Sequence, residues 1–399
     1  MSASGLSAAR LRRLREVLSR HVESGGMPGL VALVARRGEV HVEAIGTTEV
    51  GGSEPMRRDT IFRIASVTKQ IAAAAAMTMM EECRLGLDDP VDGLLPELAD
   101  RQVLTSIDAP LDDTVPAHRP VTVRDLLTFV MGLGAFMAPP GQVPIQRAMD
   151  EAELLPGSQA PDIAPDEWMK RLGNLPLAYQ PGDKWLYHTG SDVLGVLMAR
   201  AAGKPLAEVL AERVLRPLGM TDTGYHVPAA SLHRLPAAYC PDPATGAPVL
   251  TDDPRHTRWG RPPAFQSAGS GLVSTADDLL AFCTMMLNRG RHDGGRLLAR
   301  PTVELMTTDL ITEQQKAENT IFFGGNSGWG LGFQVFNRRK TIASTPGRFG
   351  WTGGTGTSVY TDPAEELIGI LLTQREMTSP GPPKVFRDFW TCAYQAIDD

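Results

Sequence analysis

A serine and a lysine stand three residues apart where an apolar stretch begins: Ser66-Val-Thr-Lys69 is followed by an apolar run from Ile71 to Met80. Residues i and i+3 of a helix lie on one face, so the Ser66 hydroxyl and the Lys69 amine can meet. A serine becomes nucleophilic when a neighbouring base takes its proton, and lysine can be that base when burial or a helix N-terminus destabilises its ammonium form. The spacing therefore predicts acyl transfer through an acyl-enzyme on Ser66, whose own backbone amide can donate to an oxyanion.

A second motif, from Pro181 to Thr189, is a loop that enters a helix and contains Tyr187. A phenol beside Ser66 and Lys69 can pass a proton to the leaving group, because its pKa falls when a cation lies next to it. The competing interpretation is a core tyrosine with a hydrogen-bonded hydroxyl. A Ser-x-x-Lys match likewise arises by chance about once in a chain of this length. The alternative interpretation of Ser66 and Lys69 is an N-cap serine followed by a solvated lysine.

The third motif is the glycine-rich run from Phe349 to Gly356, which leads into a strand. Glycines there let a substrate approach the strand edge closely and leave a backbone amide free as a second oxyanion donor. The alternative is an ordinary glycine-rich turn. Because the run opens a strand and not a helix, it does not match a phosphate-binding loop.

In this order, the three motifs resemble the serine β-lactamase and penicillin-binding-protein superfamily, and most closely its class C-like branch with the family VIII carboxylesterases. The resemblance spans nearly the whole chain and includes Val123-Arg-Asp-Leu-Leu-Thr between the first two motifs. It implies that Ser66 is the nucleophile, Lys69 the general base or its partner, and Tyr187 the proton shuttle. The amide of Gly354 would be the second oxyanion donor beside that of Ser66.

The resemblance also implies a set of substrate-binding residues: Phe129, His188, Thr189, Trp351, Thr352 and Gly353. Thr189 falls where β-lactamases of this branch carry an asparagine, and Trp351 falls where they carry the lysine of Lys-Thr-Gly. A lysine would offer a cation to a substrate carboxylate, whereas tryptophan offers an apolar wall. The pocket is therefore expected to prefer uncharged acyl groups, as an esterase does, unless Arg348 or Arg375 replaces that cation.

Two further differences from the family pattern lie near the expected pocket. Phe129-Val-Met replaces part of the Thr-His-Thr-Ser-Gly-like loop that is common in these proteins, and His188 stands inside the tyrosine motif. Either can tune substrate choice. A histidine in such a place is more often packed and hydrogen-bonded than a base, so His188 is expected among the substrate-binding residues and not among the catalytic ones.

Composition limits the classes of function. The 399 residues are 42% hydrophobic and 21% charged, with a formal net charge of −7, which is typical of a soluble globular protein and gives no basic surface for nucleic acid. The four cysteines are far apart and no His-Glu-x-x-His motif occurs, so neither a metal nor another cofactor is expected. No signal-peptide pattern and no bilayer-length apolar run occur, which predicts a cytoplasmic protein without a membrane partner.

Antiparallel strands flanked by helices are expected to position the three motifs. The predicted strands are 29–35, 40–45, 355–361 and 367–373, and the predicted helices are 71–80, 123–129, 165–172, 191–202 and 385–397. Segments 136–165 and 236–268 are rich in proline, glycine and aspartate without periodicity, so they are expected to be long loops that line the site.

The expected fold is therefore α/β (α+β), an antiparallel sheet flanked by helices with a mostly helical second subdomain, as in β-lactamases and transpeptidases. Residues 1–65 together with 265–399 would form the sheet subdomain, residues 66–264 the mainly helical one, and the active site would lie between them. The expected function is hydrolysis of small-molecule esters or amides, with small carboxylic esters preferred. An acyltransferase, a D-amino-acid peptidase, a β-lactamase and a non-catalytic ligand-binding homologue remain alternatives, and a homo-oligomer is left open.

Overall fold

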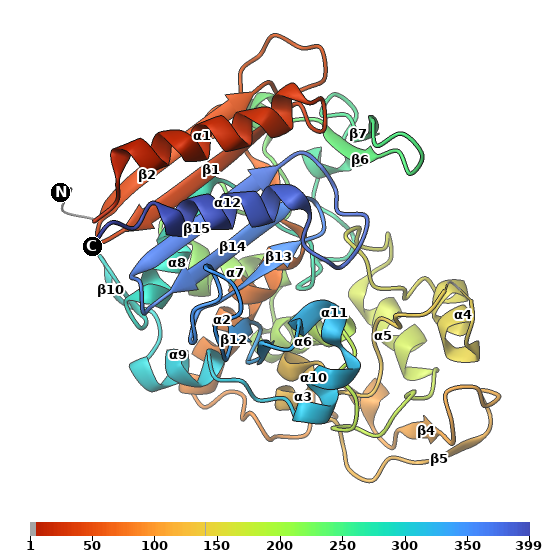
Figure 1. The fold of residues 1–399 in the computed structure, drawn as a ribbon. Coiled ribbons are helices and arrows are strands. Elements are labelled where there is room, and N and C mark those ends of the chain that lie inside the picture. The colour runs from red at the N-terminus through yellow and green to blue at the C-terminus, as the bar shows by residue number, and fades with distance from the viewer. Residues whose placement is uncertain (1–4, 140) are drawn as a thin grey trace.

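A seven-stranded antiparallel sheet organises the protein in the computed structural model, which describes residues 5–139 and 141–399 (Figure 1). In their order across the sheet the strands are β11 (Ser327–Trp329), β12 (Gln334–Phe336), β13 (Phe349–Gly353), β14 (Thr357–Asp362), β15 (Leu367–Thr373), β1 (Gly29–Arg36) and β2 (Glu39–Gly46). β1 pairs with β15, so segments from the two ends of the chain lie side by side in the middle of the sheet. Four short two-stranded antiparallel sheets complete the strands: β3 (Phe62–Arg63) with β8 (Val273–Ser274), β4 (Gln102–Leu104) with β5 (Thr114–Pro116), β6 (Ala238–Pro241) with β7 (Pro248–Asp252), and β9 (Arg291–His292) with β10 (Gly295–Arg296).

Helices cover both faces of the sheet. Their bounds are α1 (Ala8–Glu23), α2 (Thr68–Glu81), α3 (Val123–Thr128), α4 (Pro144–Glu151), α5 (Pro165–Gly173), α6 (Thr189–Ala202), α7 (Leu206–Leu210), α8 (Ala276–Leu287), α9 (Arg300–Met306), α10 (Glu313–Glu318), α11 (Thr320–Phe323) and α12 (Lys384–Gln395). α1 and α12 pack on one face, and α8 packs on the other (Figure 1). This double cover explains why every residue of β1 and β15 is buried and why their sequences are almost continuously apolar.

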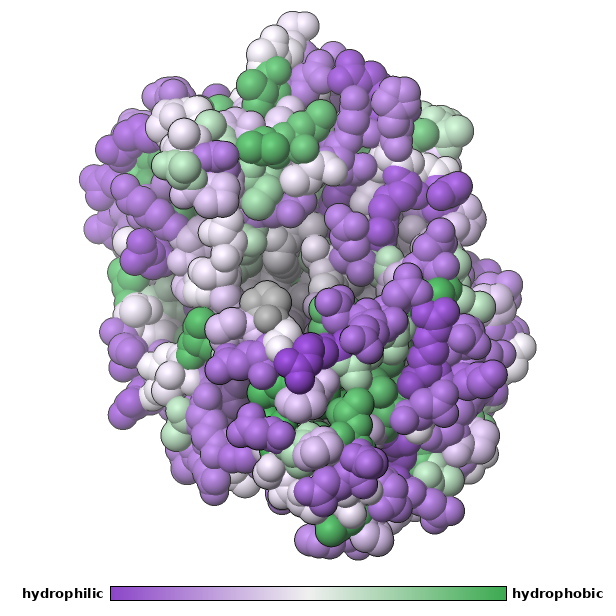
Figure 2. All heavy atoms as spheres, turned by 90° about the vertical axis from the view of Figure 1, so that its right-hand side faces the viewer, coloured by the Kyte–Doolittle hydropathy of each residue, from purple (hydrophilic) through white to green (hydrophobic). Residues whose placement is uncertain are grey.

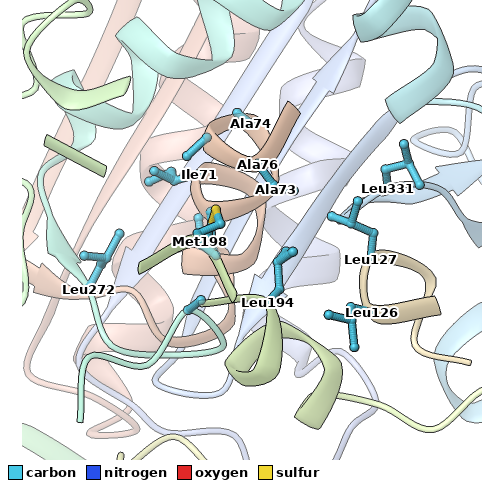
Figure 3. Close-up of a cluster of buried hydrophobic side chains, with 14 of the residues drawn as sticks. Ile71, Ala73, Ala74, Ala76, Leu126, Leu127, Leu194, Met198, Leu272 and Leu331 are labelled. Carbon is cyan, nitrogen blue, oxygen red and sulfur yellow. The ribbon is translucent and has the colours of Figure 1, made fainter. Parts of the chain in front are cut away.

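α2 is the centre of the helical half. Every residue from Thr68 to Met79 is buried, and the small alanine side chains in the middle of the helix let α6 and α7 approach closely. Figure 3 shows Ala73 and Ala76 among leucines of α3 and α6, including Leu127 and Leu194. The first turn of α2, where Ser66 and Lys69 were expected, is therefore anchored in the core.

The predicted elements agree with the structure to within three residues at each end. The 29–35 and 40–45 hairpin corresponds to β1 and β2, and the capping box that Thr122 forms with Asp125 starts α3 where the sequence predicted a helix. α6 begins at Thr189, two residues before the predicted start, and ends at Gly203, which takes a left-handed conformation. The predicted fold class, an antiparallel sheet flanked by helices, is confirmed.

The prediction that 136–165 and 236–268 are loops throughout is wrong. The first segment contains α4, which Pro144 starts and in which Ile145, Ala148 and Met149 face the core at helical spacing. The second contains the β6–β7 hairpin, whose turn is held by the Asp242 carboxylate accepting from backbone amides. Proline, glycine and aspartate serve here as helix starts and turn residues, so their density hid two short elements. Among the described residues no helix is long and apolar enough to cross a bilayer.

Candidate active site

Ser66 lies in a short 3₁₀ turn, Ala65–Val67, that leads directly into α2. Its side chain is nearly buried, and its hydroxyl oxygen is 3.2 Å from the Nζ atom of Lys69, on the first turn of the helix. Ala65, immediately before the serine, has a φ of +41°, a conformation that a residue with a Cβ atom rarely adopts. The chain is thus bent sharply at Ser66, and the serine and lysine meet as the i, i+3 spacing predicts.

Lys69 is 1% exposed and is surrounded by three acceptors. Besides Ser66 Oγ, its Nζ atom donates to the carbonyl oxygen of Gly269 at 2.6 Å and lies 3.1 Å from Nδ1 of His188. Burial lowers the pKa of Lys69 to about 7, although the carboxylate of Asp192 opposes this shift. A substantial fraction of Lys69 is therefore neutral near neutral pH, as a general base must be.

His188 connects Lys69 to a buried carboxylate. Its Nε2 atom is 3.1 Å from Oδ2 of Asp192, and Oδ1 of Asp192 accepts from the Ser267 hydroxyl at 2.6 Å and from the Gly269 amide at 3.0 Å. Burial and the nearby Lys69 charge lower the pKa of His188. A neutral imidazole with its proton on Nε2 fits these partners, because that proton reaches Asp192 and the Nδ1 lone pair faces Lys69.

Tyr187 lies beside both residues of the first motif. Its hydroxyl accepts from Nε1 of Trp351 at 2.5 Å, and Nζ of Lys69 is 4.6 Å from the ring centroid. Burial raises the pKa of Tyr187 well above its usual value, although the side chains of Ser66 and Trp351 oppose this shift. The prediction that a neighbouring cation lowers this pKa is wrong, because the loss of water outweighs the charge of a lysine that is itself easily neutralised. Tyr187 is thus a phenol that keeps its proton and can donate it.

Aromatic rings pack around Tyr187. Phe129 packs edge-to-face on it at 5.5 Å, and Trp185 stacks on it at 5.6 Å. Phe129 is 1% exposed and ends α3 in a left-handed conformation, so it supports the phenol from behind. Trp351 and Phe322 complete this wall, at 5.6 and 5.3 Å from the tyrosine ring.

The remaining predicted substrate-binding residues differ in exposure. Thr352 is half-buried on β13, whereas Thr189 is 1% exposed and its hydroxyl has no hydrogen-bond partner in the part of the chain that the structure describes. His188 is 4% exposed and contacts Lys69 and Asp192. His188 therefore contacts the lysine and its buried carboxylate partner.

The turn after β13 is tied to the segment that precedes Ser66. The hydroxyl of Thr355 donates to the carbonyl of Arg63, and the hydroxyl of Thr357 donates to the carbonyl of Ile64 at 3.2 Å. Gly353 passes so near that a Cβ atom there would come closer than 3.0 Å to the Ile64 carbonyl oxygen. The third motif is thus held against the first by contacts that need both threonines and this glycine.

Ser66 and Gly354 each lie within two residues of this contact along the chain, and their backbone amides were the predicted oxyanion donors. Neither donates a hydrogen bond to an acceptor within residues 5–139 and 141–399. Two free amides on adjacent turns fit the pair of oxyanion donors that the sequence predicted.

Replacing Gly353 with alanine is expected to lower the free energy of unfolding by about 1–3 kcal/mol and to reduce activity, because the new methyl group pushes β13 away from Ile64. Urea unfolding followed by circular dichroism measures the change. Gly354→Ala is the matched control, since a Cβ atom at Gly354 meets no other atom within 4 Å. Equal stability of the two variants would contradict the close contact at Gly353.

The two segments that were expected to line the site meet at a cavity near the serine turn, and none of Ser66, Lys69 and Tyr187 is among the residues that line it. Ser158 and Gln159 of the first, with Asp252 of the second, line a cavity of about 190 Å³ that also touches Arg63 and Thr355, next to the serine turn. Figure 2 shows the side of the molecule that carries α4, α5 and the β6–β7 hairpin, hollowed near its middle and rimmed by polar residues. Among the described residues no group of histidine, cysteine, aspartate or glutamate side chains is placed to hold a metal ion.

Sequence reasoning missed the groups that surround the lysine from other parts of the chain. Asp192 stands four residues after His188, a spacing that puts both on one face of a helix and could have indicated the pair. The roles of Ser267 and Gly269 left no comparable signal, because they meet the lysine only through tertiary packing.

The fold, with a serine in the turn before a buried helix, a lysine on the first turn of that helix and a tyrosine beside them, defines a class of protein. The chain belongs to the beta-lactamase family, whose model, described as Beta-lactamase, matches residues 14–386. It is 39% identical to Protein Rv1367c of Mycobacterium tuberculosis (strain ATCC 25618 / H37Rv), over 88% of this chain and 87% of that protein. It is 32% identical to Esterase EstB of Burkholderia gladioli, over 93% and 92%. Among solved structures it resembles EstCE1, a hydrolase with promiscuous acyltransferase activity, with a TM-score of 0.81 and 26% identity over 97% and 98% of the two chains.

Proposed function

We propose that this protein is a serine esterase that hydrolyses small carboxylic esters through an acyl-enzyme on Ser66. The observation that carries the proposal is the buried amine of Lys69, with a pKa lowered to about 7, at 3.2 Å from the Ser66 hydroxyl. The relatives named as an esterase and as a hydrolase support ester hydrolysis. The reaction would take place where the sheet half, 1–65 with 265–399, meets the helical half, 66–264.

The hydrogen bonds of Lys69 favour its action as a base. A neutral amine has two N–H groups and one lone pair. If the N–H groups point to the Gly269 carbonyl and to Nδ1 of His188, the lone pair faces Ser66 Oγ and can take its proton. His188, held by Asp192, would then be a positioning residue that orients the lysine.

The reaction then follows from the donors around the nucleophile. Ser66 Oγ attacks the ester carbonyl carbon as its proton moves to Lys69, and the amides of Ser66 and Gly354 bind the oxyanion. When the intermediate collapses, Tyr187 gives its phenol proton to the departing alkoxide and is reprotonated from Lys69. Water attacks the acyl-enzyme by the same steps in reverse and releases the carboxylic acid.

Trp351 favours esters over β-lactams. Its indole donates to Tyr187 and places an apolar ring where β-lactamases of the class C-like branch carry a lysine. A penicillin or cephalosporin carboxylate would therefore find no cation at this position. Arg348, which the sequence left open as a substitute, is 4% exposed and lies among Tyr360 and Trp390 on the α12 side of the sheet.

The test compares substrates and labels the nucleophile. We expect p-nitrophenyl butyrate to be hydrolysed much faster than nitrocefin, and a fluorophosphonate probe to label the protein but not its Ser66→Ala variant. Faster hydrolysis of nitrocefin would assign β-lactamase activity instead. A protein that takes no label and cleaves no ester would be a non-catalytic binding homologue.

The rate should depend on pH through Lys69. Since only the neutral amine can accept the serine proton, kcat/KM should rise about tenfold per pH unit below 7 and level off above it. Because burial raises the pKa of Tyr187, its phenol stays protonated and no loss of rate is expected at mildly alkaline pH. Initial rates from pH 5 to 9, corrected with the Ser66→Ala protein as blank, measure the profile. A rate that falls between pH 6 and 8 would contradict the role of Lys69.

Removing the imidazole behind Lys69 should slow the reaction without weakening binding. His188→Ala is expected to lower kcat about a hundredfold with little change in KM, because the lysine loses the acceptor that orients its lone pair. The low-pH limb of the profile should shift as well, which a purely structural role would not cause. Steady-state kinetics of this variant, with the exposed His118→Ala as control, provide the measurement. An unchanged kcat and pH profile would exclude the positioning role.

A further inference from the structure

An apolar cavity of about 430 Å³ lies beside the catalytic centre, on the face of the sheet that α12 covers. Trp351 and Thr352 of β13 line it, whereas Ser66, Lys69 and Tyr187 are not among its lining residues. It is enclosed by α11, the segment after β12 and α12, and its wall includes Phe336, Tyr360 and Trp390. Ile321 and Ile342 also line it although they are 50% and 46% exposed. Its volume and aromatic lining are typical of a site for a small organic molecule.

The polar groups of this cavity are cationic. Lys340, Arg348 and Arg387 line it, and no aspartate or glutamate is among its lining residues in the described part of the chain. This is a strong local bias, since the whole protein carries a net charge of −7. Lys340 and Arg387 are exposed, which places two cations at the rim.

Arg348 is the buried member of the three. It is 4% exposed and its guanidinium lies 3.9 Å from the ring centroid of Trp390 and 4.2 Å from that of Tyr360. One Nη atom donates to the carbonyl of Ala343, whereas Nε has no hydrogen-bond partner within the described residues. Aromatic rings and one carbonyl oxygen surround this buried cation, and it forms no ion pair within the described residues. Its positive charge is therefore poorly compensated and attracts an anion.

We propose that this cavity binds a monocarboxylate with an apolar body, such as a medium-chain fatty acid. The hydrocarbon part packs on the aromatic wall, and the carboxylate lies towards the cations at Lys340, Arg348 and Arg387. Such an acid is also the class of product that ester hydrolysis releases, but Ser66, Lys69 and Tyr187 do not line this cavity, and binding in it does not depend on the proposed esterase activity.

The cavity shares a wall with the catalytic centre. Phe322 lines it, and the same ring is 5.3 Å from the ring of Tyr187 and 6.2 Å from that of Trp351. An occupant therefore touches a side chain that packs directly on the proton donor of the reaction. This contact gives a bound acid a physical route to influence the catalytic tyrosine.

The first experiment measures binding in the Ser66→Ala protein by isothermal titration calorimetry, with octanoate, octan-1-ol and octyltrimethylammonium as probes. Octanoate is expected to bind at one site. The uncharged and the cationic probe are each expected to bind at least about tenfold more weakly than octanoate. A Lys340→Gln/Arg387→Gln double variant should weaken octanoate and not octan-1-ol, whereas the exposed Arg12→Gln should change neither. Equal affinity for octanoate and octan-1-ol, or an unchanged double variant, would overturn the proposal.

The second experiment separates this site from the catalytic centre. Wild-type protein labelled at Ser66 with a small phosphonate should bind octanoate as well as the unlabelled protein does. Loss of binding on labelling would place the acid at the nucleophile and refute a separate cavity site. A protein that binds octanoate in the first experiment but cleaves no ester would leave the cavity proposal standing and refute the esterase.

Discussion

Replacing Ser66 with alanine is expected to lower kcat/KM for p-nitrophenyl butyrate by about ten-thousandfold. The change removes the hydroxyl at 3.2 Å from the Lys69 amine, so no acyl-enzyme can form there, while the fold should persist because only one oxygen atom is lost. Initial rates, intact-mass detection of the acyl-enzyme and a thermal melt measure the three consequences.

Ser274→Ala is a suitable control for this substitution. Ser274 is also a buried serine, on β8, and its hydroxyl hydrogen-bonds with Thr223 instead of a lysine. This variant should keep most of the activity and all of the phosphonate label. Activity and label that survive Ser66→Ala would mean that another side chain is the nucleophile.

Replacing Lys69 with methionine is expected to lower kcat/KM about a thousandfold, because the base that takes the serine proton is gone. Methionine has a similar length and suits a buried site, so the melting temperature should not fall. Lys69→Arg tests the protonation state separately. A guanidinium stays protonated in proteins, so this variant should be as inactive as the methionine one although it keeps the charge.

The exposed Lys204→Met provides the control for the loss of a lysine elsewhere on the surface. Rates of phosphonate labelling report the acylation step directly and should fall in parallel with kcat/KM in both Lys69 variants. If Lys69→Arg retained most of the activity, a positive charge and not a neutral amine would be what the site requires at this position.

Much of the local structure could be predicted from the sequence. The hairpin of β1 and β2, the start of α3 at Thr122 and the end of α6 at Gly203 all follow from contacts between residues a few positions apart. The contact between Ser66 and Lys69 is also local, because one helical turn brings residues i and i+3 together. The helix α4 and the β6–β7 hairpin escaped prediction because each is short and bounded by turn residues.

The sequence by itself determined which side chains are available for chemistry and that two of them share a helix face. Only the tertiary structure decided their protonation. The pKa of Lys69 falls and that of Tyr187 rises because burial removes water from both, and the packing that buries them comes from α3, α6, β13 and the segment of Gly269. The loss of water around a side chain depends on every atom within a few ångströms of it. For Lys69 and Tyr187 many of these atoms belong to residues a hundred or more positions away in the chain, so a local sequence pattern could not reveal either pKa shift.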